Sequence, residues 1–170
     1  MEANPPKTGK FSLNYGLILG GLGVIFGLML FMSDAHTSQS PVNSIISIVM
    51  SLGVIFWGIL NFRKANEGFL SIGEALKLGA GIALVAGIVS VLYVMILSNV
   101  LDPDFPSKVM DARLADVAGD FTPEQLQQQK EMGLKFWWFG YPVILIVNII
   151  IGLIIGLVGG LIFKKVQPDY

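Results

Sequence analysis

Apolar residues are concentrated in four long blocks along the chain instead of recurring as stripes on amphipathic helices. These blocks cover residues 13–32, 42–62, 72–101 and 137–163. The first, second and fourth blocks contain no charged residue, and the third is uncharged from Leu78 onward. At a rise of about 1.5 Å per residue, roughly 20 helical residues cross a hydrocarbon core of about 30 Å. The pattern therefore predicts an all-α integral membrane protein with four transmembrane helices.

The composition argues against the main alternative, in which the four helices lie buried inside a soluble protein. Hydrophobic residues make up 54% of the 170 positions, charged residues make up 14%, and the mean hydropathy is +0.70. A soluble domain carries about a quarter charged residues, and a chain of this length cannot build an outer layer around four such helices. We expect one transmembrane domain, 13–163, between short tails at 1–12 and 164–170.

Basic residues near the ends of the blocks predict the orientation of the protein. They lie in the N-terminal tail, the second loop and the C-terminal tail, at Lys7, Lys10, Arg63, Lys64, Lys164 and Lys165. The first loop, 33–41, contains none, and the connection 102–136 contains four basic residues against seven acidic ones. Because Lys and Arg favour the cytoplasmic side, we expect both termini in the cytoplasm. The first loop and the connection 102–136 are then extracytoplasmic.

The N-terminal segment also has features of a secretory signal peptide. Lys7 and Lys10 precede the first block, and the small residues Ser33 and Ala35 follow it. Signal peptides have apolar cores of about 7–15 residues, whereas this block has 20. We therefore expect the first block to remain in the protein as a membrane span.

The extracytoplasmic connection carries two helix signals. Met110, Leu114 and Val117 recur at helical spacing, which predicts a short amphipathic helix over 107–118. Thr122 and Gln125 then have the spacing of a capping box, which predicts a second helix running toward the fourth span. Two interpretations stay open, a cap that docks a partner over the bundle and a solvated linker kept soluble by its acidic residues.

Aromatic residues cluster where the fourth span begins, at Trp137, Trp138 and Tyr141. Amphipathic rings favour the headgroup level of a bilayer, so we expect these residues to be interfacial anchors. A role in a ligand site is the alternative. His36 belongs to the short first loop on the same side of the membrane, where we expect a solvated side chain.

Small residues recur at four-residue intervals inside three of the spans. The stripes are Gly16 and Gly20 in the first span, Gly79, Ala83 and Gly87 in the third, and Gly152, Gly156 and Gly160 in the fourth. In hydrocarbon, close backbone approach over small residues supplies the contact that holds helices together. The stripes therefore predict helix-packing faces, either within one chain or between chains.

Three polar side chains are candidates for function because polar groups in a span are costly. Glu74 and Lys77 lie at the start of the third span, where they form either a proton or ion relay or a local ion pair favoured by the helix dipole. Asn148 is the most deeply placed strong polar residue of the fourth span. We expect its amide to hydrogen-bond across helices to a serine, at Ser47, Ser51 or Ser90.

The inventory of reactive residues argues against an enzyme. The chain has no Cys and a single His, and it contains no phosphate-binding loop, zinc-binding helix motif or set of nucleophile, His and acid. We therefore expect no catalytic residue, cofactor or metal. A net charge of −1 gives no attraction toward nucleic acid.

One segment carries a family resemblance. Residues 66–79, NEGFLSIGEALKLG, together with the Asp102-Pro103-Asp104-Phe105 turn and the Gly-rich fourth span ending in Lys164-Lys165, resemble the bacterial membrane family known as domain of unknown function 4199. The resemblance covers about residues 10–166. It implies a four-span inner-membrane protein with an extracytoplasmic segment before the last span, and it brings no activity, substrate or catalytic residue.

These observations predict a non-enzymatic membrane protein whose small-residue faces serve association. Its expected partners are the lipid bilayer, a second copy of the chain, or a larger membrane assembly in which it is an accessory subunit. The alternative is a component of a small-solute or ion transporter or channel, with Glu74, Lys77 and Asn148 as its polar lining.

Overall fold

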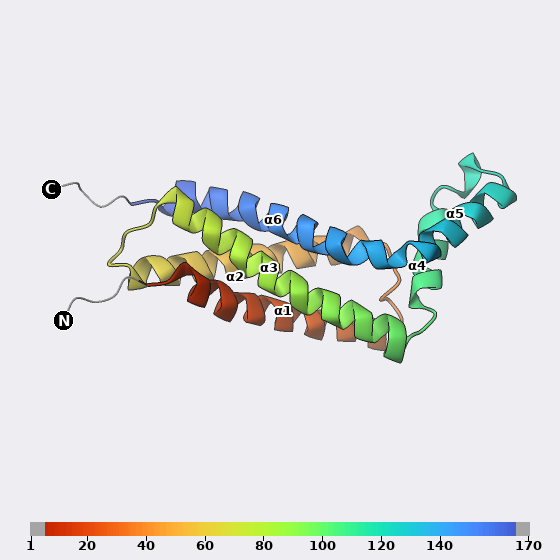
Figure 1. Ribbon diagram of the computed structural model, residues 1–170, viewed down its shortest axis with the longest axis horizontal. Helices are drawn as coiled ribbons and strands as arrows, with labels where there is room; N and C mark the ends of the chain where they lie inside the picture. The colour runs from red at the N-terminus through yellow and green to blue at the C-terminus, as the bar shows by residue number, and fades with distance from the viewer. Residues whose placement is uncertain (1–5, 166–170) are drawn as a thin grey trace.

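A computed structural model describes residues 6–165 as an elongated bundle of four long helices with a pair of short helices at one end (Figure 1). The long helices are α1 (Thr8–Met32), α2 (Pro41–Ala65), α3 (Ile72–Ile96) and α6 (Gly140–Phe163). A π-helical turn, Leu97–Leu101, extends α3, and a 3-10 turn, Trp137–Phe139, precedes α6. The outer parts of the two predicted tails, 1–5 and 166–170, lie outside the described residues.

The four predicted spans are confirmed as helices long and apolar enough to cross a membrane. With their adjoining turns they run over Thr8–Met32, Pro41–Ala65, Ile72–Leu101 and Trp137–Phe163. The first helix begins five residues before the apolar block, and the second continues three residues beyond it. Hydropathy marks the part of a helix that lies in hydrocarbon, whereas the helix itself continues until a cap or turn ends it.

The short helices α4 (Phe105–Ala115) and α5 (Pro123–Lys135) form a small subdomain, here called the cap. The predicted capping box at the start of α5 is present, since Thr122 Oγ1 accepts from the Gln125 N–H and Gln125 Oε1 accepts from the Thr122 N–H. Helix α4 begins two residues before its predicted start, because Pro106 fits the first turn of a helix. Figure 1 shows the cap projecting from one end of the bundle, here called the cap end. The opposite end, which carries residues 6 and 165, is the terminal end.

The small-residue stripes lie between helices of the same chain. A Cβ atom added at Gly79 of α3 would overlap the Gly152 carbonyl oxygen of α6 and lie 2.8 Å from the Gly156 Cα atom. A Cβ added at Gly20 of α1 would lie 2.7 Å from the Cβ of Val89 in α3. The other stripe residues make similar contacts, namely Gly16 with Val85, Ala83 with Gly152, Gly87 with Leu145 and Asn148, and Gly160 with Ala75. Helix α3 therefore packs its backbone closely against both α1 and α6.

The larger of two buried clusters occupies the terminal half of the bundle, and the smaller one, Leu97, Phe105 and Val109, lies at the cap end. The largest fully buried side chains come from the second half of α2, the first half of α3 and the turn between them, and they are Ile55, Ile59, Phe62, Leu70, Leu78 and Ile82. The buried residues of α1 and α6 lie in the same half of the bundle. Along α2, in contrast, no residue from 41 to 53 is buried.

The segment that carries the family resemblance builds the turn from α2 to α3 at the terminal end. Gly68 has φ +86°, a backbone conformation that glycine adopts without steric cost. The Arg63 Nε–H donates to the Gly68 carbonyl at 2.9 Å. Leu70, which is completely buried, exchanges two backbone hydrogen bonds of 2.9 Å with Lys165. This turn therefore joins three helices, because it links α2 to α3 and fastens the end of α6.

Candidate functional site

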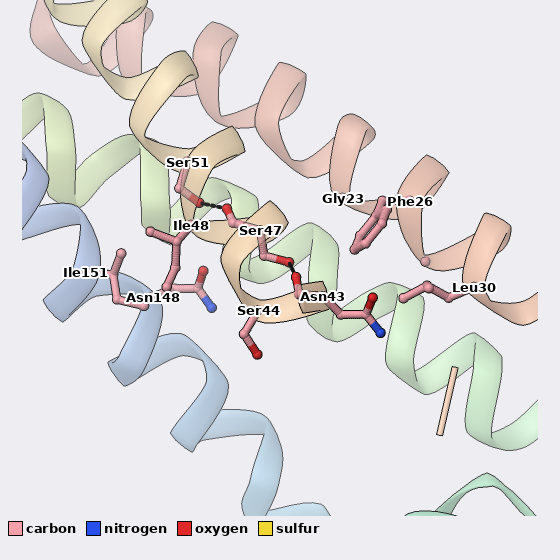
Figure 2. Close-up of a pocket in the computed structure, with 11 residues that line it drawn as sticks. Gly23, Phe26, Leu30, Asn43, Ser44, Ser47, Ile48, Ser51, Asn148 and Ile151 are labelled. Carbon is pink, nitrogen blue, oxygen red and sulfur yellow. Dashed lines mark hydrogen bonds between the residues drawn. The ribbon is translucent and has the colours of Figure 1, made fainter. Parts of the chain in front are cut away.

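A cavity of about 460 Å³ lies in the cap half of the bundle, between α1, α2 and α6 (Figure 2). Its polar lining comes from successive turns of α2, at Asn43, Ser44, Ser47 and Ser51, and from Asn148 of α6. Its apolar lining includes Gly23, Phe26 and Gly27 of α1 and Ile151 of α6. We call this cavity the polar groove. It exists because small side chains face one another where α2 no longer packs into the core.

The hydrogen bonds of the polar groove run along helices and not across them. Ser47 Oγ donates to the Asn43 carbonyl and Ser51 Oγ to the Ser47 carbonyl, each at 2.9 Å. Asn148 Nδ2 donates to the Ile144 carbonyl at 2.8 Å. Within residues 6–165, no hydrogen bond joins α2 to α6 across the groove. Each of these donors is therefore satisfied by the carbonyl four residues earlier in its own helix.

The prediction that the Asn148 amide hydrogen-bonds to a serine on another helix is wrong. Ser47 and Ser51 do line the same groove as Asn148, but its amide donates to its own helix. Ser90, the third candidate, donates to the Ala86 carbonyl of α3 at 3.0 Å. The physical reason is that a carbonyl one turn away is always within reach, whereas the groove separates the facing helices.

Hydrogen-bonding capacity remains free in the polar groove. In the described part of the chain, the Asn43 side-chain amide and the Ser44 hydroxyl form no hydrogen bond, and the side-chain oxygen Oδ1 of Asn148 has no donor. Ser44 and Ser47 are exposed in the isolated chain. The lining residues are uncharged. Chemically, the groove can bind an uncharged group that both donates and accepts hydrogen bonds.

Glu74 and Lys77 lie at the terminal end, far along the bundle from Asn148, so the three predicted polar candidates are not brought together. Glu74 completes a capping box, because its Oε2 accepts from both the backbone N–H and the hydroxyl of Ser71 at 2.8 Å. No ion pair joins Glu74 to Lys77 in the described residues. The sequence signature was present, since Ser71 and Glu74 have the spacing of a capping box before an apolar run.

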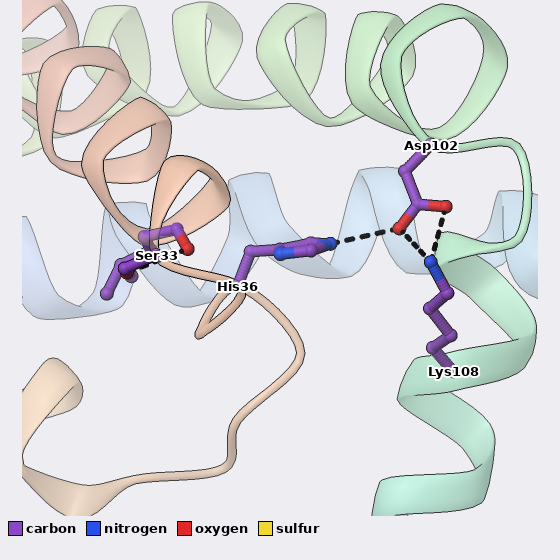
Figure 3. A network of polar contacts seen from close by, with 5 residues as sticks. Ser33, His36, Asp102 and Lys108 are labelled. Carbon is purple, nitrogen blue, oxygen red and sulfur yellow. Dashed lines mark hydrogen bonds and ion pairs between the residues drawn. The ribbon is translucent and has the colours of Figure 1, made fainter.

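A polar network at the cap end joins the first loop to the start of the cap (Figure 3). His36 Nε2 lies 2.9 Å from Asp102 Oδ2, and Lys108 Nζ donates to both Asp102 oxygens at 2.8 Å. The Phe105 ring stacks on His36 at 5.8 Å between centroids. The prediction of a solvated His36 is wrong, since its side chain is only 9% exposed. The reason is that Asp102, 66 residues later, lies beside the first loop.

Electrostatics stabilises the charged forms in this network. Hydrogen bonds from Lys108 and then His36 hold the pKa of Asp102 below its ordinary value, against the opposing effect of burial. The same contact with Asp102 raises the pKa of Lys108. Asp102 is therefore ionised and Lys108 protonated at neutral pH, so the loop and the cap are held together by a charge-assisted network.

The three predicted aromatic anchors differ in their surroundings. Trp138 is 59% exposed, as a residue facing lipid or the interface would be. The Trp137 ring packs edge-on against Phe105 at 5.8 Å, and its indole nitrogen is buried. Trp137 and Tyr141 both line a second cavity beneath the cap. Trp137 therefore belongs to the contact between cap and bundle.

Comparison with known proteins identifies a family and no further relative. The model of a family described as "Protein of unknown function (DUF4199)" matches residues 14–165. No curated protein and no solved structure matches the chain.

Proposed function

The chain belongs to the DUF4199 family, and from that premise we propose that it is a non-enzymatic accessory subunit of an assembly in the bacterial inner membrane. In this proposal, both termini lie in the cytoplasm and the cap lies outside. The polar groove receives a membrane-spanning helix of a partner protein. The observation that carries the proposal is an open groove whose polar lining begins in the first turn of α2, continues along the span to Ser51 and Asn148, and keeps free hydrogen-bonding capacity.

The argument rests on the cost of exposing polar groups to hydrocarbon. A donor or acceptor without a partner in the bilayer core is strongly disfavoured. Asn148 Oδ1, inside the α6 span, has free capacity, as do the Asn43 side-chain amide and the Ser44 hydroxyl near the start of α2, and the Ser47 hydroxyl is exposed. Polar side chains of this kind hydrogen-bond to neighbouring helices in membranes. A helix seated in the polar groove would satisfy these groups and cover the small residues beside them.

The glycine stripes support a partner at the groove instead of at the stripes. Gly79, Gly152 and Gly156 are in contact with one another inside the chain, so they are not free for a second molecule. The first half of α2, in contrast, has an exposed apolar residue among its serines, Ile48, which also lines the polar groove. A partner helix would find both apolar and hydrogen-bonding contacts on this face.

The direct test is site-specific photo-crosslinking in native membranes. A photoreactive amino acid at Ser47 faces the polar groove, and the matched control is the same residue at Ile154, which is 58% exposed on α6. We expect Ser47 to yield a discrete adduct with an apolar, span-length peptide, and Ile154 to yield lipid adducts. Asn148→Leu should abolish the Ser47 adduct. Lipid adducts alone at both positions would contradict the proposal.

A second candidate, transport of a small uncharged solute, is favoured by the depth of the polar lining. Asn43 and Ser51 are eight residues apart on α2, which corresponds to roughly 12 Å along the helix. The lining thus leads from the cap end toward the middle of the bundle, where the core around Ile55 begins. Solute flux in proteoliposomes that is lost in Asn148→Leu, with no crosslinked partner in membranes, would favour this candidate.

The proposed orientation has its own test, because the chain has no native Cys. Single cysteines at Gln127, in α5, and at Ala65, at the end of α2, lie at opposite ends of the bundle. A membrane-impermeant thiol reagent added to intact cells should label Gln127→Cys and leave Ala65→Cys unlabelled. The reverse pattern would overturn the orientation.

A further inference from the structure

The second cavity has a volume of about 630 Å³ and lies where the cap meets the start of α6. We call it the cap pocket. Its walls are mainly apolar and aromatic, with Val94 from α3, Phe105 and Val109 from α4, and Val143 from α6. The α6 residues belong to the first turns of a membrane span, so the pocket reaches from the cap to the level of the membrane surface. Its volume is within the range of about 300–1,000 Å³ typical of small-molecule sites.

Three polar groups of the cap pocket lack partners within residues 6–165. Arg113 is exposed and forms no ion pair with the residues that the structure describes. The Trp137 indole nitrogen is buried with no hydrogen-bond partner. The His36 side chain is nine-tenths buried, and its Nδ1 atom is also without a partner. Because Arg can only donate hydrogen bonds, the exposed Arg113 is available to an acceptor in the pocket, whereas the indole and imidazole nitrogens are enclosed by protein atoms.

From these observations we propose that the cap pocket binds an anionic amphiphile, a molecule with an acyl chain and a carboxylate or phosphate head. The apolar walls take the chain, which enters from the membrane beside α6. The Arg113 guanidinium pairs with the head, and the Trp137 ring forms part of the wall beside the ligand. Arg is suited to this role because its planar fork matches carboxylate and phosphate geometry. A free fatty acid and a phospholipid with an exposed phosphate share this chemistry.

The buried network beside the pocket fixes its shape. His36 Nε2 is engaged by Asp102, and Phe105 lies between His36 and Trp137, in contact with both rings. The carboxylate of Asp102 is itself neutralised by Lys108. The negative charge nearest to His36 is therefore already paired, and among the residues that line the cap pocket Arg113 is the Lys or Arg side chain available to a ligand.

The test uses bromine quenching of Trp137 fluorescence in the full-length chain. The other tryptophans are replaced by Phe (W57F/W138F), and the protein is placed in nanodiscs of zwitterionic phosphatidylcholine. The probes are a dibrominated fatty acid, a brominated phosphatidic acid, and the methyl ester of the brominated fatty acid. We expect saturable quenching by at least one of the two anions. The arm that saturates at lower concentration identifies the source of the head group.

Variants at Arg113 test the head-group contact. Arg113→Gln should lower the affinity for the anionic probe about tenfold or more, as expected for loss of a charge-assisted hydrogen bond. Arg113→Lys should restore part of that affinity. Lys164→Gln, which removes the same charge at the terminal end, is the matched control and should bind normally. Equal quenching by the methyl ester, or quenching that neither saturates nor depends on Arg113, would overturn the proposal.

Discussion

The two halves of the bundle are built differently, although both are made of the same four apolar helices. In the terminal half, glycine backbones of α3 and α6 touch and six large side chains are fully buried. In the cap half, α2 has no buried residue over 41–53 and faces the polar groove. The difference teaches that apolar character alone does not make a core in a membrane, because lipid is as apolar as the side chains. Close packing requires small residues at matching positions.

The comparison also separates stability from function. The terminal half contains the contacts that a folded bundle needs, including the turn between α2 and α3 and its capping box. The cap half contains the free polar groups and the two cavities. Substitutions in the first region should therefore affect folding of the bundle, whereas substitutions that line the two cavities of the cap half should affect binding.

The largest effect is expected from Gly79→Ala in the terminal half. The added Cβ atom would overlap the Gly152 carbonyl oxygen and lie 2.8 Å from the Gly156 Cα atom. Neither backbone can move freely, so we expect a loss of about 1–3 kcal/mol or more. The matched variant is Gly53→Ala in α2, where no atom lies within 4 Å of the added Cβ. It should be neutral or more stable by up to about 1 kcal/mol.

Unfolding by a denaturing detergent, followed by helical circular dichroism, measures this difference. Equal unfolding midpoints for the two glycine variants would mean that the two halves do not differ in packing, and would contradict the comparison.

A smaller effect is expected from Asp102→Ala at the cap end. The substitution removes the hydrogen-bond partner of the nearly buried His36 and of Lys108, at a cost of about 1–3 kcal/mol to the attachment of the cap. Limited trypsin digestion within 102–136 should become faster. The control is Asp111→Ala, which removes an exposed ion pair with Lys130 and should change the rate little. Equal digestion rates for both variants would contradict a stabilising network.

The same network predicts a pH dependence. Because the pKa of Asp102 is lowered in the folded protein, its contribution is present above the ordinary carboxyl pKa of about 4 and is lost as the pH falls through the folded value. The raised pKa of Lys108 adds a contribution that is lost only at strongly alkaline pH. Fluorescence of Trp137 in a W57F/W138F background should report release of the cap below about pH 4. In the Asp102→Asn variant, the cap should already be released at neutral pH, and the fluorescence should show no transition at acidic pH.

Loss of the capping box at the start of α3 should have a modest effect. Ser71→Ala removes the acceptor of the Glu74 N–H and is expected to cost about 0.5–1 kcal/mol in the same unfolding measurement. Glu74→Gln should cost less, since Gln also completes a capping box. A large functional loss in Glu74→Gln with normal stability would instead assign Glu74 the relay role that its position at the helix end does not suggest.

The smallest effect on stability is expected from Asn148→Leu. Its amide donates to its own helix and to no other residue described, so replacement by an apolar side chain should shift stability by less than about 0.5 kcal/mol. Binding of a partner helix should nevertheless be lost. A strong destabilisation by Asn148→Leu would show that the polar groove contributes to the fold and would blur the division between the halves.

Much of the fold could be predicted from the sequence because its signals are local. A span is visible as an uncharged run of sufficient length, and the Thr122–Gln125 capping box is visible as a spacing of three residues. The positions of the small-residue stripes were equally visible, but their partners were not. The same Gly79 could have faced α6, α1 or a second chain, and only the three-dimensional arrangement selects α6.

The site was harder to predict because it depends on separations between helices. The pairing of Asn148 was misjudged because a bond to the carbonyl of Ile144 is available in any helix, whatever lies opposite. His36 and Asp102 are 66 residues apart, and their contact depends on the ends of two spans meeting at the same end of the bundle. The placement of both residues on the same predicted side of the membrane was the available signal for this contact.

Thiol labelling of Ser47→Cys tests the central claim most directly, that the polar groove of the cap half is a docking surface for a membrane helix. A small water-soluble thiol reagent should modify Ser47→Cys readily in the purified protein and much more slowly in native membranes, where the partner helix covers the groove. Gln127→Cys in the exposed α5 helix should react at the same rate in both. Equal rates for Ser47→Cys in the two preparations, with the Gln127→Cys control reacting normally, would contradict the account.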